Sequence, residues 1–273
     1  MPARRRSPRM RTDNIRLGNG ARIHAGALQP ADAGQAARRP VLVFLHEGLG
    51  STRMWKGFPQ ALCDVAGCEG LLFDRQGHGQ SDPQQQPRTI HYLHRYGLEE
   101  LPQVLAQAIP ERDYIVIGHS DGGSIGLLHA AERPARLRGL ITLAAHIYVE
   151  DVTLQGIRDA LDAWHAGKLR GLARYHGDRV EQVFMAWNAT WLTPAFAHWN
   201  MAYALPAISV PTCVMQGAGD QYATVQHMHD IAAGIHAATD QLLPDCGHSP
   251  HLENPEATLQ AMQQVLQDWG VLA

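Results

Sequence analysis

The sequence predicts an α/β fold, in which a mostly parallel central sheet carries helices on both of its faces. The first observation is a series of short apolar segments that alternate with helical stretches along the 273 residues, a pattern typical of parallel sheets. The second is an antiparallel hairpin expected at the start of the chain. The third is a helical and aromatic stretch, 146–208, in which the strand pattern stops. The length fits one large α/β domain or two small ones.

The elements follow from local patterns. Residues 15–28, IRLGNGARIHAGAL, alternate polar and apolar side chains around Gly18 and Gly20, which predicts a β-hairpin. Continuous apolar runs predict strands that are buried on both faces. These runs are VLVFLH (41–46), GLLFD (70–74), DYIVIG (113–118), LRGLITLAA (137–145), PTCVMQG (211–217) and TDQLLPD (239–245). Helices are predicted up to about residue 66, over 97–109, from 120 to before 134, between the last two strands, and from 255 to the end.

The stretch 146–208 is predicted to form a helical cap over the sheet. It is rich in aromatic residues, and Ile157, Leu161 and Trp164 have the i, i+4, i+7 spacing of one helix face. We therefore divide the chain into three parts. They are a disordered basic tail (1–13), an α/β core (14–145 and 209–273) and the helical cap (146–208).

Charge and cysteine content indicate where the protein works. Five arginines lie within the first eleven residues, and without them 18 basic side chains face 26 acidic ones, a balance of −8 that argues against a nucleic-acid-binding face on the body. No apolar run is long enough to span a membrane, and no apolar stretch follows the basic start, as it would in a secretory signal. Cys63 and Cys68 are close enough in sequence for a disulfide, but reduced thiols are expected without such a signal. We therefore expect a cytoplasmic protein that binds neither nucleic acid nor membrane. The sequence does not indicate its oligomeric state. The predominance of arginine, with only Lys56 and Lys168 as lysines, fits a GC-rich bacterial genome.

Ser120 is the candidate nucleophile. It stands in GHSDG (118–122), directly after an apolar run and before the apolar positions of a helix. This is the setting of a nucleophile elbow, a strained turn that needs the small Gly118 and Gly122 on either side. The alternative is a serine that only caps the helix. His119 follows the strand geometry and should point away from the turn.

A serine hydroxyl needs a neighbouring base, because it is too weakly acidic to attack alone. His248, in DCGHSPH (245–251), follows the last predicted strand, and Asp220, in GAGD (217–220), follows the strand before it. The carboxyl ends of parallel strands meet at one edge of a sheet. We therefore predict that Ser120, His248 and Asp220 form a catalytic triad there, with Asp151 as the rival acid.

Two backbone N–H groups must face the oxyanion that develops during acyl transfer. Asp121, directly after the nucleophile, should supply one, and Gly48, after the first buried strand, the other. Metal binding is not predicted. The His pairs at 91 and 94 and at 227 and 229 belong to no recognisable ligand set.

The motifs HEGLG, DRQGHGQSDP, GHSDGG, GAGD and CGHSPHLENPE, taken in this order, resemble the landmarks of the α/β-hydrolase fold family over roughly residues 15–270. The resemblance implies a serine hydrolase that needs no cofactor and acts on a small-molecule ester or related acyl substrate. Family members with an aspartate nucleophile, such as dehalogenases and epoxide hydrolases, are disfavoured by Ser120.

Glu47 is a departure from this family, which often has glycine after the histidine of the first motif. A carboxylate aimed at the oxyanion would oppose its charge, so we expect Glu47 to point away, toward Arg75 or Arg53. Alternatively, it lines the pocket and binds a substrate cation or holds a water molecule. Together with Asp121 it would then favour an amine-bearing ester. The other candidate substrate-binding residues are His146, Tyr148, Trp187 and Trp191, although most aromatic side chains of the cap are expected only to pack it onto the sheet.

The predicted function is hydrolysis of a small carboxylic ester through an acyl-enzyme intermediate. The same triad would serve a lactonase, a thioesterase or a C–C bond hydrolase that acts on intermediates of aromatic degradation. A non-catalytic ligand-binding module on the same fold is the alternative from another class.

Overall fold

The computed structural model describes residues 10–32, 34 and 36–272. The strands are β1 (Ile15–Arg16), β2 (Arg22–Ile23), β3 (Ala25–Leu28), β4 (Val41–Leu45), β5 (Gly70–Phe73), β6 (Tyr114–His119), β7 (Leu137–Leu143), β8 (Thr212–Gly217) and β9 (Ala238–Leu243). The α-helices are α1 (Phe58–Ala66), α2 (Tyr92–Arg95), α3 (Leu101–Ala108), α4 (Asp121–Ala131), α5 (Asp151–His165), α6 (Ala173–His176), α7 (Val180–Trp191), α8 (Gln226–Gly234), α9 (Pro250–Glu253) and α10 (Pro255–Asp268).

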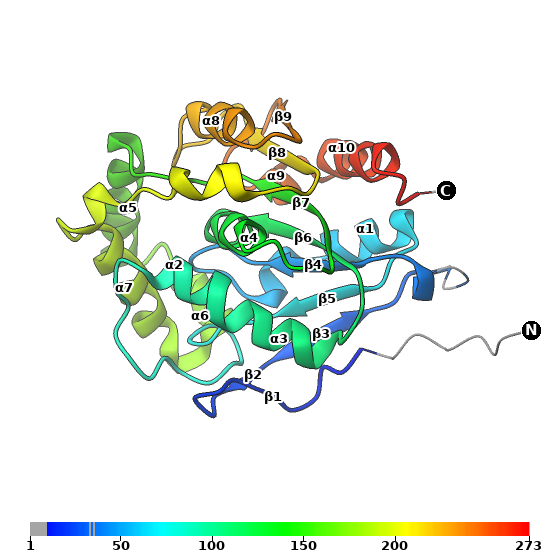
Figure 1. Ribbon diagram of the computed structural model, residues 1–273. Helices are drawn as coiled ribbons and strands as arrows, with labels where there is room; N and C mark the ends of the chain where they lie inside the picture. The colour runs from blue at the N-terminus through cyan, green and yellow to red at the C-terminus, as the bar shows by residue number, and fades with distance from the viewer. Residues whose placement is uncertain (1–9, 33, 35, 273) are drawn as a thin grey trace, which may run out of the picture.

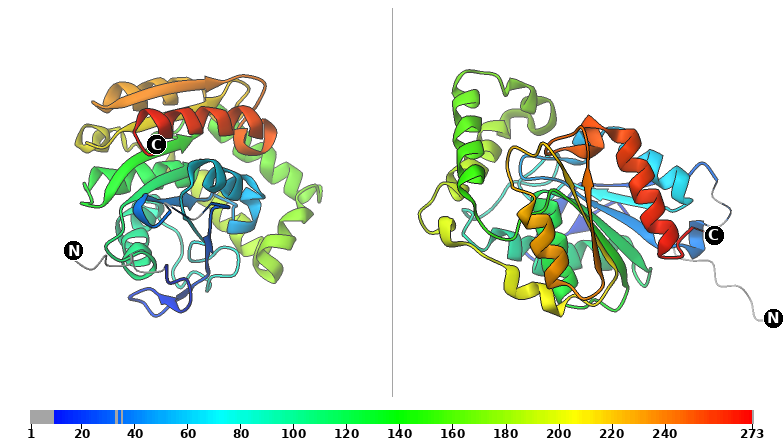
Figure 2. Two further views of the ribbon diagram at one scale, coloured as in Figure 1. Left: turned by 90° about the vertical axis from the view of Figure 1, so that its right-hand side faces the viewer. Right: turned by 90° about the horizontal axis from the view of Figure 1, so that it is seen from above.

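The central sheet has seven strands within the described residues, in the order β3-β5-β4-β6-β7-β8-β9. β3 is antiparallel to β5, and the remaining neighbours are parallel. The predicted fold class, a mostly parallel sheet between helices, is therefore confirmed. Figures 1 and 2 show the sheet between its two layers of helices.

Side chains of the buried strands alternate between the two faces of the sheet. Val41 and Val43 of β4 pack in one apolar cluster with α3, α4 and α8, whereas Leu42 and Phe44 pack in a second cluster with α1 and α10. Successive side chains of a strand point to opposite faces. The continuous apolar run of β4 is therefore what a strand covered on both sides requires.

The predicted N-terminal hairpin is shorter than expected. β1 pairs antiparallel with β2 across a turn in which Gly20 has φ 84°, as the glycine-rich sequence indicated. Residues Ala25–Leu28, which we included in the hairpin, form β3 and pair instead with β5 of the central sheet. β3 thus forms one edge strand of the central sheet. It does not extend the hairpin.

Of the predicted basic tail, residues 1–9 lie outside the described part of the chain, and the residues that follow them are held by contacts. Met10 packs against the apolar core, and the backbone N–H of Arg11 donates to the carbonyl of Ala108 at 2.8 Å. The helix predicted over 97–109 starts with a π-helical turn, Tyr96–Glu100, that continues from α2 into α3. In the described residues, no helix combines the length and the apolar character needed to cross a membrane.

The helices between β7 and β8 lie at one end of the sheet (Figure 1). α5, α6 and α7 are joined by the short 3-10 turns Arg170–Leu172 and Gly177–Arg179, and the turns Phe196–His198 and Ala202–Ala207 lead back to β8. We call the stretch 146–208 the helical insertion. Its position brings α5 and α7 above the loops that follow β4, β6 and β8, where the candidate side chains lie.

Candidate active site

Ser120 occupies a sharp turn between β6 and α4. Its backbone has φ 52° and ψ −119°, a conformation that side chains other than glycine rarely adopt. A Cβ atom on Gly118 would overlap the backbone of Gly122, and one on Gly122 would overlap the carbonyl of Leu45. The two glycines therefore leave the space that the turn requires, and the turn presents the serine hydroxyl at the carboxyl end of the sheet.

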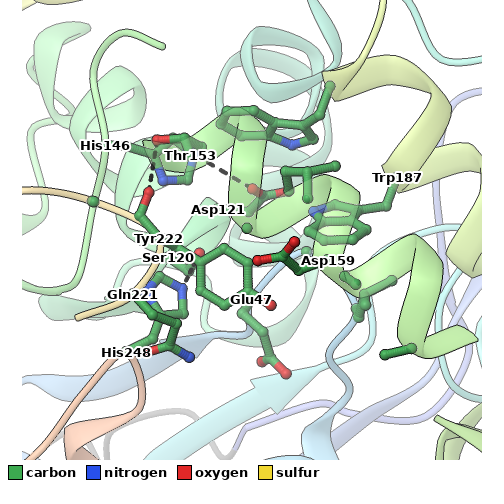
Figure 3. Close-up of a pocket in the computed structure, with 18 of the residues that line it drawn as sticks. Glu47, Ser120, Asp121, His146, Thr153, Asp159, Trp187, Gln221, Tyr222 and His248 are labelled. Atoms are coloured by element: carbon green, nitrogen blue, oxygen red, sulfur yellow. Dashed lines mark hydrogen bonds and ion pairs between the residues drawn. The ribbon is translucent and has the colours of Figure 1, made fainter. Parts of the chain in front are cut away.

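His248, in the loop between β9 and α9, connects Ser120 to Asp220. Its Nε2 lies 2.9 Å from Ser120 Oγ (Figure 3), and its Nδ1 lies 2.9 Å from Oδ1 and 3.0 Å from Oδ2 of Asp220. In this arrangement the ring can take the proton of the serine hydroxyl while the carboxylate holds its opposite nitrogen. The structure thus brings together the three side chains that we predicted as a triad.

The carboxylate of Asp220 is fixed from a second side by the backbone. The N–H of Tyr222 donates to Oδ1 at 2.8 Å, and the Asp220 side chain is buried. Burial by itself would raise the pKa of this carboxyl group, but the hydrogen bond and the charge of His248 outweigh it and lower the pKa. The rival acid Asp151 is an exposed residue at the start of α5, and both His248 contacts go to Asp220.

Gly48 and Asp121 lie beside Ser120 in the wall of one cavity. Gly48 follows β4, and Asp121 is the first residue of α4, where a helix leaves its backbone N–H groups without intrahelical partners. Gly48 is also packed tightly, because a Cβ atom there would lie 2.5 Å from Nε1 of Trp187 and 3.1 Å from Oδ2 of Asp121. The absence of a side chain thus lets the loop after β4 approach both the Asp121 side chain and α7.

The cavity has a volume of about 420 Å³ and extends from Ser120 and His248 to the helical insertion. Its apolar wall comes largely from the insertion and includes Ile157, Ala160, Leu169, Leu172, Trp187 and Trp191. Three carboxylates, from Glu47, Asp121 and Asp159, lie in the same wall, and no Lys or Arg is among the described residues that line it. Figure 3 shows these three acids around the nucleophile.

The predicted pocket residues divide into two groups. Trp187, Trp191 and His146 line the cavity. Tyr148 does not. Its ring stacks on His227, with centroids 4.1 Å apart, and its hydroxyl donates to Asp230 at 2.8 Å. The prediction for Tyr148 is therefore wrong, because a stacking partner and an acceptor on α8 draw the side chain away from the cavity.

The Glu47 carboxylate makes no ion pair with Arg75 or Arg53, the partners named in the first of our two expectations. Arg75 donates to the backbone carbonyls of His46 and Glu47, and Arg53 donates to the carbonyl of Arg174. The Glu47 carboxylate lines the cavity, as the second expectation stated, and its Oε2 lies 3.7 Å from Nδ1 of His119.

Asp121 carries a buried carboxylate with a partner that the sequence did not reveal. The hydroxyl of Tyr92 donates to Oδ2 at 2.8 Å, and the same hydroxyl accepts the indole N–H of Trp191 at 3.0 Å. Nε2 of His146 lies 3.5 Å from Oδ1 (Figure 3). Burial would raise the pKa of Asp121. The positive charge of the nearby His146, with the hydrogen bond from Tyr92, contributes to outweighing it, and the pKa is lowered.

Sequence reasoning missed Asp159 and Tyr222 as well. The Tyr222 ring lies 4.8 Å from the ring of His248, between centroids, and its place two residues after Asp220 was a usable signal. Asp159 and Tyr92 offered none. Asp159 lies at a polar position of the predicted cap helix, away from the apolar face. Tyr92 comes from a segment that does not directly follow a predicted strand.

The chain resembles a known protein family and several characterised proteins. Residues 42–261 match the family described as the alpha/beta hydrolase family. The chain is 29% identical over 257 residues to 2-succinyl-6-hydroxy-2,4-cyclohexadiene-1-carboxylate synthase of Enterobacter sp. (strain 638), which covers 83% of this chain and 92% of that protein. It is 24% identical over 203 residues to serine hydrolase BPHL of Mus musculus, which covers 72% and 69%, respectively.

Solved structures share the same architecture. The crystal structure of VinJ superposes with a TM-score of 0.70 at 22% identity, covering 96% of this chain and 100% of VinJ. At this level of identity the likeness concerns the fold.

Proposed function

The chain belongs to the alpha/beta hydrolase family and is a hydrolase, and from this premise we propose that it cleaves a small carboxylic ester through an acyl-enzyme intermediate. The observation that carries the proposal is the contact of His248 with both Ser120, at 2.9 Å, and Asp220, at 2.9 Å. A hydroxyl, an imidazole and a carboxylate in this order activate the serine as a nucleophile.

In the proposed reaction, Ser120 Oγ attacks the ester carbonyl carbon while His248 Nε2 takes the hydroxyl proton. Asp220 stabilises the imidazolium that forms, and the backbone N–H groups of Gly48 and Asp121 donate to the oxyanion. His248 then passes its proton to the leaving alcohol. In the second half, the same nitrogen removes a proton from water, which attacks the acyl carbon and releases Ser120.

The cavity supports a substrate that is largely apolar and carries no negative charge. Its wall is mostly apolar, and its charged lining residues are Glu47, Asp121 and Asp159. An anionic substrate would be repelled by these carboxylates at short range. The Enterobacter relative is named for a compound that bears a succinyl group and a carboxylate, and we propose that this chain acts on a different substrate.

An amine-bearing ester is the second candidate within this reaction class. The same three carboxylates support it, because a substrate ammonium group would complement their charge. Asp121 is partly engaged by Tyr92 and His146, whereas Asp159 is exposed toward solvent. A substrate ammonium would therefore be attracted most directly by Asp159 and Glu47.

A cytoplasmic location is also proposed. Cys63, Cys68, Cys213 and Cys246 are all free and buried, which suits a reducing compartment. Burial raises the pKa of Cys63 to about 12, so this thiol remains protonated and unreactive at neutral pH.

Three p-nitrophenyl esters of matched size test the reaction and the charge preference together: the 3-phenylpropionate, its 2-amino analogue and its 2-carboxy analogue. We expect turnover of the neutral ester and at least about tenfold lower kcat/KM for the anionic one, since about 1.4 kcal/mol of repulsion gives that factor. Equal kcat/KM for the neutral and amino esters would remove the amine-bearing candidate.

The alternatives are separated by the same assay. Lactones and CoA thioesters are assayed alongside, because a lactonase or thioesterase would prefer them. A fluorophosphonate probe then tests for the activated serine. A non-catalytic binding module would neither label at Ser120 nor turn over any of these compounds, and that result would overturn the proposal.

A further inference from the structure

Glu47 has a role that the proposed reaction leaves unexplained. It stands where the family motif often has glycine, and its carboxylate has neither of the arginine partners that we expected. Within the described residues, the one basic side chain in ion-pair distance of Glu47 is His119, at 3.7 Å between Oε2 and Nδ1. Glu47 therefore faces a histidine that belongs to the nucleophile motif itself.

His119 connects this carboxylate to the loop that carries the proposed general base. It is the last residue of β6, and its side chain is only 2% exposed. As predicted, it points away from the turn at Ser120, toward the face on which Trp55 and His251 pack. Its Nε2 lies 2.8 Å from the backbone carbonyl oxygen of His248. Because a carbonyl oxygen can only accept, Nε2 must carry a hydrogen and donate it.

The proton on Nε2 restricts the other ring nitrogen. In the neutral ring, Nδ1 would be an acceptor and would turn its lone pair toward the carboxylate of Glu47. In the imidazolium, Nδ1 carries a second hydrogen and the contact becomes an ion pair. Nδ1 of His119 is buried and has no hydrogen-bond partner in the described part of the chain. The Glu47 carboxylate is therefore the group that can balance a positive charge on this ring.

We propose that Glu47 and His119 are positioning residues of the site: Glu47 holds His119 as an imidazolium, and the Nε2–H of His119 fixes the backbone of His248. The inference rests on the proposed function, because it assigns a purpose to the position of His248. A hydrogen bond donated by a charged group is roughly twice as strong as a neutral one. It acts on the residue whose ring must meet both Ser120 and Asp220.

The Glu47 carboxylate also balances the positive charge of the His119 imidazolium that it stabilises. The rings of His119 and His248 lie 5.2 Å apart between centroids. An uncompensated imidazolium at His119 would oppose the positive charge that His248 gains when it takes the serine proton. Burial would raise the pKa of Glu47, but the positive charges of His119 and Arg75 contribute to outweighing it, and the pKa is lowered. The carboxylate thus stays ionised and balances the ring.

A double-mutant cycle tests the coupling between the two residues, with kcat and KM measured on the ester that the protein turns over best. His119→Gln keeps an N–H that can donate to the His248 carbonyl, but it is uncharged and needs no counter-charge. We expect Glu47→Gln to lower kcat about tenfold in the wild-type background and to have little effect in the His119→Gln background.

Rescue by the conservative variant separates positioning from packing. His119→Leu removes the donor, and we expect kcat to fall about ten- to a hundredfold with KM within about twofold of wild type. His119→Gln should recover most of this loss. Glu132→Gln, the same chemical change at an exposed site after α4, is the matched control. If His119→Leu fails to fold, the cycle of the two amide variants still decides the coupling.

Nitrogen NMR of the His119 ring gives a readout that does not require activity. We expect both ring nitrogens to be protonated at neutral pH in the wild type, and only Nε2 in Glu47→Gln. A neutral His119 in the wild type, or equal effects of Glu47→Gln in both backgrounds, would overturn the inference. Failure of the proposed function has a different signature, because ester turnover would then survive Ser120→Ala while the NMR result remained.

Discussion

Nε2 of His248 lies 2.9 Å from Oγ of Ser120, although the two residues are 128 positions apart in the chain. Ser120 follows β6 and His248 follows β9, and in the sheet these strands are separated by β7 and β8. The contact therefore depends on the correct order and register of four parallel strands, and the activity of the site reports on the whole carboxyl edge of the sheet.

Replacement of the nucleophile should abolish turnover without unfolding the chain. Ser120→Ala removes only the hydroxyl group. Alanine has no larger side chain than serine, so we expect the turn to keep its positive φ. We expect ester hydrolysis to fall by at least about a thousandfold, with an unchanged circular dichroism spectrum. Retained turnover in this variant would refute the acyl-enzyme mechanism.

Replacement of the acid should leave His248 misoriented. Asp220→Asn keeps the size of the side chain but presents an amide to Nδ1, so the ring loses the partner that selects its tautomer. We expect kcat to fall about a thousand- to ten-thousandfold. Asp151→Asn, the same change in the rejected acid, should keep wild-type kcat. The assignment fails if the two variants behave in the opposite way.

The glycines of the nucleophile turn should be intolerant of alanine. A Cβ atom on Gly122 would overlap the backbone carbonyl of Leu45, which cannot move without disturbing β4. We expect Gly122→Ala to lower the free energy of unfolding by about 3 kcal/mol or more. Gly171→Ala is the control, because a Cβ atom there would meet nothing within 4 Å. Equal melting temperatures for both variants would contradict this account.

Tyr92 should support both the cavity wall and the buried carboxylate of Asp121. Tyr92→Phe removes the hydroxyl that donates to Asp121 and accepts from Trp191. We expect a loss of about 1–3 kcal/mol in unfolding free energy, since a buried carboxylate loses its donor. Tyr203→Phe removes a hydroxyl from a side chain that is 71% exposed and should be nearly neutral. Denaturant unfolding of both variants measures the difference.

Glu100 should make stability depend on pH. Its carboxyl group is buried near Gln76, and burial raises its pKa from 4.5 to about 7. The folded state thus holds this proton over a pH range in which the unfolded state has lost it. The contribution of Glu100 to stability is therefore fully present below pH 4.5 and is lost as the pH rises toward 7, by about 3 kcal/mol.

Glu100→Gln should remove this dependence. We expect the variant to gain unfolding free energy relative to the wild type as the pH rises from 4.5 to 7, and the difference to become constant above that range. Urea unfolding of both proteins at several pH values isolates this group, because all other titrations are shared. A difference that does not change with pH would mean that Glu100 titrates normally.

The fold and the candidate triad could largely be predicted from local patterns. Apolar runs predicted the buried strands, and the glycines on either side of Ser120 predicted a tight turn in which larger residues would not fit. The order of the motifs then indicated which side chains would meet, because parallel strands deliver their carboxyl ends to one edge. The hairpin was overextended at Ala25–Leu28, since alternation alone cannot tell which strand a segment will pair with.

The sequence by itself determined the class of fold, the elbow at Ser120 and the residues available to activate it, because periodicity and backbone freedom are properties of short segments. Only the tertiary structure decided that Glu47 faces His119, that Tyr92 reaches Asp121, and that Tyr148 turns to α8. These directions depend on contacts between residues that are distant in the chain, 82 positions apart for the Tyr148 hydroxyl and its acceptor. Side chains that leave a strand end or a loop take the partners that packing provides, and no local pattern specifies those partners.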